Sequence, residues 1–328
     1  MFFPRIFLLL TLALATLTAC AAPTPTPSAP SAKLQVVTTV SPITNIIQNV
    51  GGDRIDVTGI VPEGVNSHTF EPAPSDARLL AQADIIFVNG LFLEEPTIKL
   101  AESNKREGVE IISLGEQTVT PDEYVFDFSF PAEAGNPNPH LWMNPLYAAR
   151  YAELVAESLA AADPANADFY RANAAAFGER IDALDKAIAA TVATIPAGNR
   201  RLLTYHDSFA YFAPRYGFSV LGAVQPADFS EPSAQEVARL ITQLREEKIP
   251  AIFGSEVFPS PILEQIAKES GAVFIDQLRD DDLPGEPGDA NHSYFGLLVE
   301  DVRVITAALG GDASGLDGIA TGRLGSGE

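Results

Sequence analysis

Three of the four histidines in this chain lie at the ends of predicted strands or helices. His68 follows a predicted strand, His140 directly precedes a predicted helix, and His206 lies where a strand gives way to a helix. In open α/β sheets, the loops beyond the carboxyl ends of the strands converge on one cleft. Imidazole nitrogens and carboxylate oxygens are ligands that Zn²⁺ accepts. The three histidines are therefore candidate ligands of one transition metal ion.

A carboxylate is expected to complete this ligand set. Asp276 ends the predicted strand 272–276 and so has the same kind of position as the histidines. Several other acids compete for the fourth place: Glu71, Asp207, Glu256 and Asp280. Glu71 and Asp207 are also candidates to accept a hydrogen bond from a ligand imidazole, although a helix cap is the favoured role for Asp207. The fourth histidine, His292, lies in an acidic loop and is expected to be a surface residue.

Two series of alternating strands and helices must position these residues. In the first, β-branched runs predict strands at 34–40, 55–61, 85–89 and 109–113, with helices at 41–50, 75–83 and 94–104. In the second, strands are predicted at 201–205, 219–224, 251–254 and 272–276, with helices at 208–216, 233–248, 261–270 and 294–309. Such alternation favours βα units and parallel sheets. The expected fold is α/β, with a lobe at 33–163 and a second lobe at 197–310.

A long helix is predicted between the two lobes, over residues 164–196. Its apolar residues recur at helical spacing: Phe177, Ile181, Leu184, Ile188 and Val192. This spacing places them on one face of a helix that would be roughly 40 Å long. We interpret it as a connector between the lobes, the alternative being a core helix of one larger domain. The last residues, 311–328, are rich in Gly, Ser and Asp and are expected to form a flexible tail.

The chain begins with a predicted leader and tether. Residues 1–19 have one Arg, a short apolar run and the ending Leu-Thr-Ala before Cys20, which resembles the lipobox of bacterial lipoproteins. Cys20 would then be the acylated first residue of the mature chain. Residues 20–32 are rich in Pro, Thr, Ser and Ala and predict an extended tether. We expect the protein to be held by its lipid at the outer face of the cell membrane.

Composition excludes several classes of protein. The 328 residues carry 21 basic and 43 acidic side chains, a net charge of −22, which disfavours binding of nucleic acid through a positive field. The chain has one Cys, so it has neither an internal disulfide nor a Cys-rich zinc cluster. A metal site must then be built from imidazole and carboxylate groups.

The histidine segments together resemble the ZnuA/TroA-like solute-binding lipoproteins of bacterial ABC importers for zinc, manganese and iron. The residues that carry the resemblance occur in order along the chain: Gly64, His68, Glu71 and Pro72; His140, Trp142, Asn144 and Pro145; Tyr205, His206, Asp207, Phe209 and Phe212; Phe274 and Asp276. The resemblance implies that His68, His140, His206 and Asp276 bind the ion between two similar lobes. Asp276 is the acid that matches the motif. The family usually has Asp-Pro before its first histidine, whereas this chain has Asn66-Ser67, a difference that affects loop rigidity more than ligation.

The resemblance implies capture of a divalent metal and its delivery to an ABC permease with its ATPase. Zinc is favoured because manganese and iron relatives usually have Glu in place of the third histidine, here His206. Many zinc relatives also have a His-rich loop, and residues 117–138 contain no histidine. We expect the protein to be a monomer. We do not expect an enzyme, since a zinc hydrolase would need an open metal position and the sequence has no His-Glu-x-x-His motif. A metal-dependent adhesin on the same scaffold is a further alternative.

Overall fold

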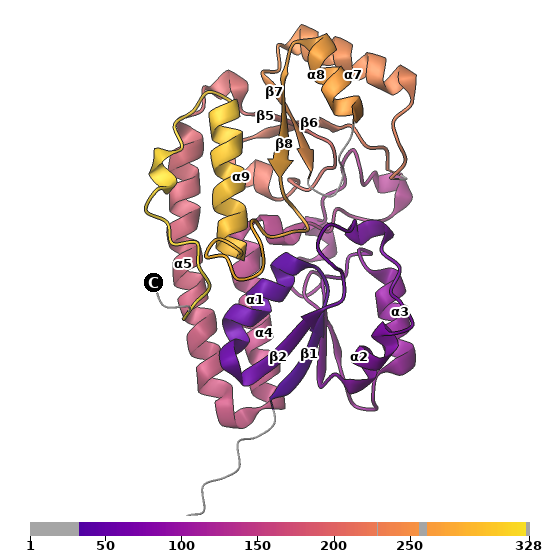
Figure 1. The fold of residues 1–328 in the computed structure, drawn as a ribbon, viewed down its shortest axis with the longest axis vertical. Helices are drawn as coiled ribbons and strands as arrows, with labels where there is room; N and C mark the ends of the chain where they lie inside the picture. Colours follow the sequence, from indigo (N-terminus) through magenta and orange to yellow (C-terminus); the bar gives the residue numbers. More distant parts are fainter. Residues whose placement is uncertain (1–32, 228, 256–260, 326–328) are drawn as a thin grey trace, which may run out of the picture. The chain divides into compact units, whose positions relative to one another are not determined.

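Two parallel four-stranded sheets form the framework of this computed structural model, which describes residues 33–227, 229–255 and 261–325 (Figure 1). The first sheet contains β1 (Leu34–Thr38), β2 (Ile55–Gly59), β3 (Ile85–Val88) and β4 (Ile111–Ser113). The second contains β5 (Arg201–Thr204), β6 (Ser219–Ala223), β7 (Ala251–Ser255) and β8 (Val273–Leu278). Their spatial orders, β2-β1-β3-β4 and β6-β5-β7-β8, follow the same topology. The predicted α/β fold with two mainly parallel sheets is confirmed.

Helices cover the sheets, as the sequence predicts for parallel strands. They are α1 (Ser41–Gly51), α2 (Asp76–Gln82), α3 (Glu95–Asn104), α4 (Pro145–Ala162), α5 (Ala167–Ala193), α6 (Phe212–Tyr216), α7 (Ala234–Glu247), α8 (Pro261–Ser270) and α9 (Tyr294–Ala308). All four residues of β3 are buried, because both faces of a parallel sheet are covered. Two segments differ from prediction: α6 is much shorter than the expected helix 208–216, and β8 continues beyond residue 276.

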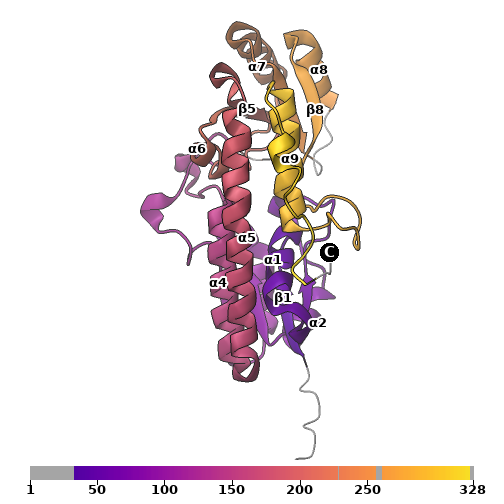
Figure 2. The same ribbon diagram turned by 90° about the vertical axis from the view of Figure 1, so that its left-hand side faces the viewer.

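The predicted long helix is α5, which begins after a short 3-10 turn at Pro164–Asn166. Its buried side chains include the five predicted apolar residues, Phe177, Ile181, Leu184, Ile188 and Val192. Through this face α5 packs against α1 and α4, which belong to the part of the chain that forms the first sheet, and against α9, which follows the second sheet (Figure 2). The expected lobe boundaries at 163 and 196 stay predictions, since the chain from Lys33 onward forms one compact unit.

The expected flexible tail is wrong for residues 311–325. Leu316 is fully buried in a short turn at Ser314–Leu316. Arg180 of α5 donates to the carbonyl oxygen of Ala320 at 2.7 Å, and the Leu324 backbone N–H donates to Asn49 at 2.8 Å. Isolated apolar side chains and backbone hydrogen bonds hold this segment in place, although its composition is typical of loops.

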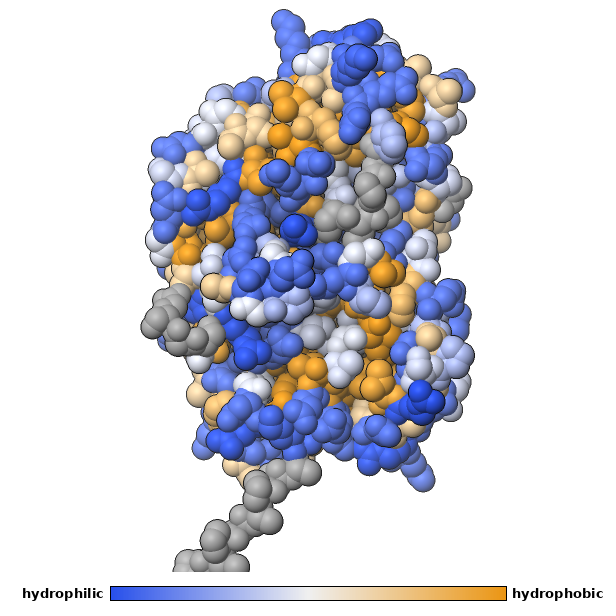
Figure 3. Space-filling view, in the orientation of Figure 1, coloured by the Kyte–Doolittle hydropathy of each residue, from blue (hydrophilic) through white to orange (hydrophobic). Residues whose placement is uncertain are grey.

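The predicted leader, tether and Cys20 lie outside the described residues. Within the described part of the chain, none of the helices has the length and apolar character that crossing a membrane requires. On the face drawn in Figure 3, hydrophilic side chains divide the apolar areas into separate patches, in keeping with a strongly acidic surface.

Candidate metal centre

Three loops bring His68, His140 and His206 to one point. His68 lies in a 3-10 turn after β2, His140 immediately precedes the turn that leads into α4, and His206 follows β5. The Nε2 atom of His68 is 3.2 Å from that of His140 and 3.1 Å from that of His206, and the remaining pair is 3.3 Å apart. Three residues that are far apart in the sequence thus present the same ring atom to one another.

These separations suit a shared metal ion. With Zn–N bonds of about 2.0–2.1 Å and tetrahedral angles, two ligand nitrogens lie about 3.3–3.4 Å apart. Longer bonds at smaller angles give a similar separation, so the three nitrogens alone do not select one metal. The triad is the one group of His, Cys, Asp and Glu ligand atoms among the described residues in which at least three lie within 4.8 Å of one another.

Burial keeps the three imidazoles neutral. His140 is 0% exposed and His206 is 2% exposed. Burial lowers the pKa of His68 and that of His140 well below 6.5, and electrostatic repulsion from neighbouring histidines lowers both further. Burial also lowers the pKa of His206, opposed by the Asp280 carboxylate and by a hydrogen bond with Gln225. Because a metal binds the neutral imidazole, the site is already in its binding form at neutral pH.

Two amide side chains fix the orientation of the buried imidazoles. Asn138 Oδ1 lies 2.8 Å from His140 Nδ1, and Gln225 Oε1 lies 3.2 Å from His206 Nδ1. An amide oxygen only accepts hydrogen bonds, so each Nδ1 carries the proton and each Nε2 lone pair is left for a metal. Asn138 is itself held by donating to Asp127 Oδ2 at 2.8 Å and to the Asp207 carbonyl oxygen at 2.7 Å.

The structure does not bring Asp276 to the triad, so this expectation is corrected. Asp276 lies within β8, which ends at Leu278, and its side chain is exposed. Asp280 lies just beyond the carboxyl end of the strand, is 3% exposed, and lines a small cavity together with His206. Its carboxylate acts electrostatically on His206. The Asp280 carbonyl oxygen accepts a hydrogen bond from the Trp142 indole N–H at 2.9 Å.

Glu71 and Asp207 are not part of the group of histidine ring nitrogens. Glu71 is exposed and is not part of the triad. Asp207 is 0% exposed, and burial together with the nearby Asp127 carboxylate raises its pKa well above the usual range. Because α6 begins only at Phe212, Asp207 does not cap a helix as expected. Glu256 lies outside the described residues.

A cavity of about 180 Å³ leads to the triad from the side of His68. Aromatic side chains border it: the Phe229 ring stacks on His68 with a centroid separation of 4.8 Å, and Phe130 lies 5.4 Å from the same imidazole. His68 lines this cavity, whereas His140 and His206 are not among its lining residues. An ion entering by this route would meet His68 first.

Residues 36–308 match the family described as "Zinc-uptake complex component A periplasmic", ZnuA. The chain belongs to the ZnuA family. The match extends from β1 to the end of α9 and so includes both sheets, the long helix and all three histidines.

Relatives in this family carry names for different metals. The iron-binding protein YfeA of Yersinia pestis is 33% identical, covering 86% of this chain and 88% of YfeA. The manganese ABC transporter substrate-binding lipoprotein PsaA of Streptococcus pneumoniae is 30% identical, covering 85% and 90%. Among solved structures, the periplasmic zinc-binding protein TroA of Treponema pallidum has a TM-score of 0.76 and 27% identity, covering 85% of this chain and 99% of TroA.

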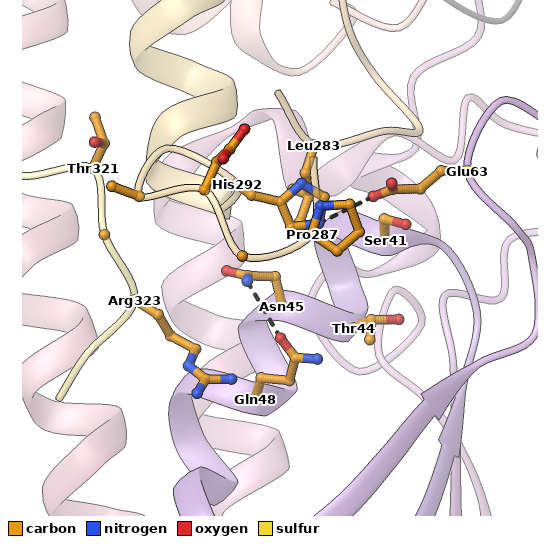
Figure 4. A pocket seen from close by; sticks show the side chains of 14 residues that line it. Ser41, Thr44, Asn45, Gln48, Glu63, Leu283, Pro287, His292, Thr321 and Arg323 are labelled. Carbon is orange, nitrogen blue, oxygen red and sulfur yellow. Dashed lines mark hydrogen bonds and ion pairs between the residues drawn. The ribbon is translucent and has the colours of Figure 1, made fainter. Parts of the chain in front are cut away.

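A larger cavity, of about 690 Å³, is lined by a different part of the fold (Figure 4). It lies among α1, the loop after β8 and residues 321–323, and its lining includes none of the triad. His292, expected at the surface, is largely buried at its edge and lies 3.5 Å from a Glu63 carboxylate oxygen. His292 therefore takes part in a contact between the segment that precedes α9 and the loop that follows β2.

Proposed function

We propose that this protein captures a divalent transition metal ion, with zinc favoured, and delivers it to an ABC permease that works with an ATPase. The observation that carries the proposal is the triad of imidazoles, with His140 and His206 buried and the three Nε2 atoms 3.1–3.3 Å apart. Membership of the ZnuA family and relatives named as substrate-binding lipoproteins of metal ABC transporters support the transport role. The same membership argues for a binding protein rather than an enzyme.

Asp280 is proposed as the fourth ligand in place of Asp276. Three imidazoles and one carboxylate form a nitrogen-rich set that suits four-coordinate Zn²⁺. Manganese prefers more oxygen ligands, which supports zinc for a site with three histidines. Relatives named for manganese and iron make these ions the alternative cargo. A metal-dependent adhesin on the same scaffold stays a further alternative.

The site is tested by a competition titration of the protein without residues 1–32 with Zn²⁺ and Mn²⁺ against a chelator of known affinity. Wild type should bind one ion per chain. Loss of a hydrogen-bond partner of a metal ligand alone weakens binding about 10–100-fold, so His140→Ala, which removes the ligand itself, should weaken binding at least about a hundredfold. His292→Ala is the matched control and should bind as wild type. Absence of stoichiometric binding, or an unaffected His140→Ala variant, would refute the site.

The cargo needs a separate measurement, because proteins of this chemistry bind Zn²⁺ more tightly than Mn²⁺ whichever ion they transport. Deletion of the gene in its own host should lower the cellular content of zinc under zinc limitation. Loss of manganese or iron with zinc unchanged would assign the alternative cargo.

The lipid anchor on Cys20 and the monomeric state are part of the same proposal. Mass spectrometry of the membrane fraction should find the lipid on Cys20, and Cys20→Ala should move the protein to the soluble fraction. Light scattering of the tether-free protein should give the mass of one chain.

A further inference from the structure

Three consecutive buried aspartates follow β8, and two of them contact the loop that carries His68. Asp281 is 4% exposed and Asp282 is 8% exposed. Asp281 Oδ2 accepts the Ser67 backbone N–H at 3.0 Å, and Asp282 Oδ2 accepts the Gly64 backbone N–H at 2.7 Å. These contacts join residues 214 and 218 positions apart in the sequence.

The loop that receives these hydrogen bonds has little regular structure of its own. Between β2 and α2 its one regular segment is the 3-10 turn Ser67–Thr69, which Asn66 caps by accepting the His68 backbone N–H at 2.9 Å. Gly64 has φ +76°, a conformation that favours glycine. Because a buried backbone N–H left without an acceptor is costly, the two aspartates help to determine where this loop lies.

The contact depends on a residue that is unusual for the motif. Where the family usually has proline before its first histidine, this chain has Ser67, and proline has no N–H to donate. Ser67 is 2% exposed, so its N–H has Asp281 as a buried partner instead of water. The Asp281 contact is thus possible in this chain because position 67 is not proline.

The same junction has a second, weaker component at the edge of the large cavity. Figure 4 shows Glu63 and His292 facing each other there, with His292 Nε2 3.5 Å from a Glu63 carboxylate oxygen. Glu63 precedes Gly64 directly, and His292 belongs to the segment that continues from Asp282 to α9. Residues on both sides of the contact therefore hold the loop after β2 against the segment after β8.

We propose that Asp281 and Asp282, bound to the Ser67 and Gly64 backbone N–H groups, form a latch that positions His68 and slows release of the metal ion. The inference rests on the proposed metal-binding function. The latch residues act through His68 and do not touch the ion. Because the adjacent Asp280 is the proposed ligand, the latch connects two of the four ligands, one from each sheet. Release of the ion then requires this junction to open.

The decisive experiment compares Asp281→Ala, Ser67→Pro and the double variant. Ser67→Pro removes the donor, and the extended conformation of Asn66 (ψ 114°) is the one preferred before proline. Asp281→Asn keeps an acceptor oxygen and serves as the conservative variant. Asp289→Ala is the control for removing an aspartate that accepts a backbone N–H, since this exposed side chain accepts the N–H of Glu286 in its own loop.

Metal release is followed by stopped flow after mixing the zinc-loaded protein with excess chelator. Each single variant should raise the dissociation rate about tenfold, the effect of leaving one buried donor or acceptor unpaired, with little change in the association rate. The double variant should be no faster than either single one, because both remove the same contact. Asp281→Asn should stay within about threefold of wild type. Rates equal to those of Asp289→Ala, or additive effects in the double variant, would overturn the latch.

Hydrogen exchange of the metal-free protein separates this inference from the proposed function. The amides of residues 64 and 67 should be protected in wild type and Asp289→Ala, and the amide of residue 67 should exchange faster in Asp281→Ala. This result can be obtained even if the protein binds no metal. Unprotected wild-type amides would refute the latch, and failure of wild type to bind zinc would refute the function.

Discussion

Asn138 provides a sensitive test of how the site is organised. Its Oδ1 atom lies 2.8 Å from His140 Nδ1 and accepts the His140 backbone N–H at 3.0 Å, in a fully buried position. Asn138→Leu keeps a similar volume but removes the acceptor. In the metal-bound state Nδ1 must carry a proton that then has no partner, at a cost of about 1–3 kcal/mol. The metal-free protein can avoid this cost by moving the proton to Nε2.

The cost therefore falls mainly on the bound state and should weaken metal binding by about 10–100-fold. The chain supplies its own probe, because its one tryptophan, Trp142, is fully buried with its ring 5.1 Å from that of His140. Fluorescence titration against a competing chelator gives the dissociation constant. Asn136→Leu, at an exposed position two residues earlier, is the control. If Asn138→Leu folds normally and binds within about twofold of wild type, the tautomer argument is wrong.

Three further predictions concern the ligand set, proton competition and stability. Asp280→Asn should weaken zinc binding by about a hundredfold or more, and Asp276→Asn should leave it unchanged; the reverse order in titrations would restore Asp276 as the ligand. Because burial lowers the pKa of all three histidines below 6.5, affinity should be constant from mildly alkaline to neutral pH and should fall only at lower pH, where protons compete; calorimetry that detects imidazole proton release on binding at neutral pH would contradict this. Lys248 is exposed and has φ +52° directly after α7, so Lys248→Gly should stabilise the protein by about 0.5–1 kcal/mol in denaturant unfolding. A loss of stability would show that the lysine is not strained there.

The sequence predicted most element boundaries to within one or two residues, because apolar runs and helical spacing reflect burial directly. It also predicted that the three histidines would lie together, as they do, since the carboxyl ends of parallel strands converge. The helix at 208–216 was predicted too long: Phe209, Ala210 and Tyr211 are buried in a non-helical segment before α6. Local propensity could not show that tertiary packing would hold these residues outside a helix.

Asp276 lies away from the triad for a reason specific to edge strands. β8 lies at the edge of its sheet, and Val273 in it is 58% exposed. An edge strand tolerates polar side chains along its length, so Asp276 and Gln277 look like the end of a strand that in fact continues to Leu278. The strand thus ends two residues later than predicted, and Asp280, the proposed fourth ligand, follows that end.

The amides that orient the imidazoles had little signal in the sequence. Asn138 and Gln225 lie in loops, where a side chain follows no periodic pattern. The position of Asn138 two residues before His140 could have suggested a local hydrogen bond to the histidine backbone. Gln225 is 19 residues from His206, and only the pairing of β5 with β6 brings them together.

The central claim is that His68, His140 and His206 hold one metal ion together. The most direct measurement is anomalous diffraction at the zinc edge from crystals of the zinc-loaded protein. We predict one main peak, about 2.0–2.1 Å from the Nε2 atom of each of the three histidines. A peak elsewhere, for example beside Glu63 and His292, with no density among the three imidazoles, would contradict the account.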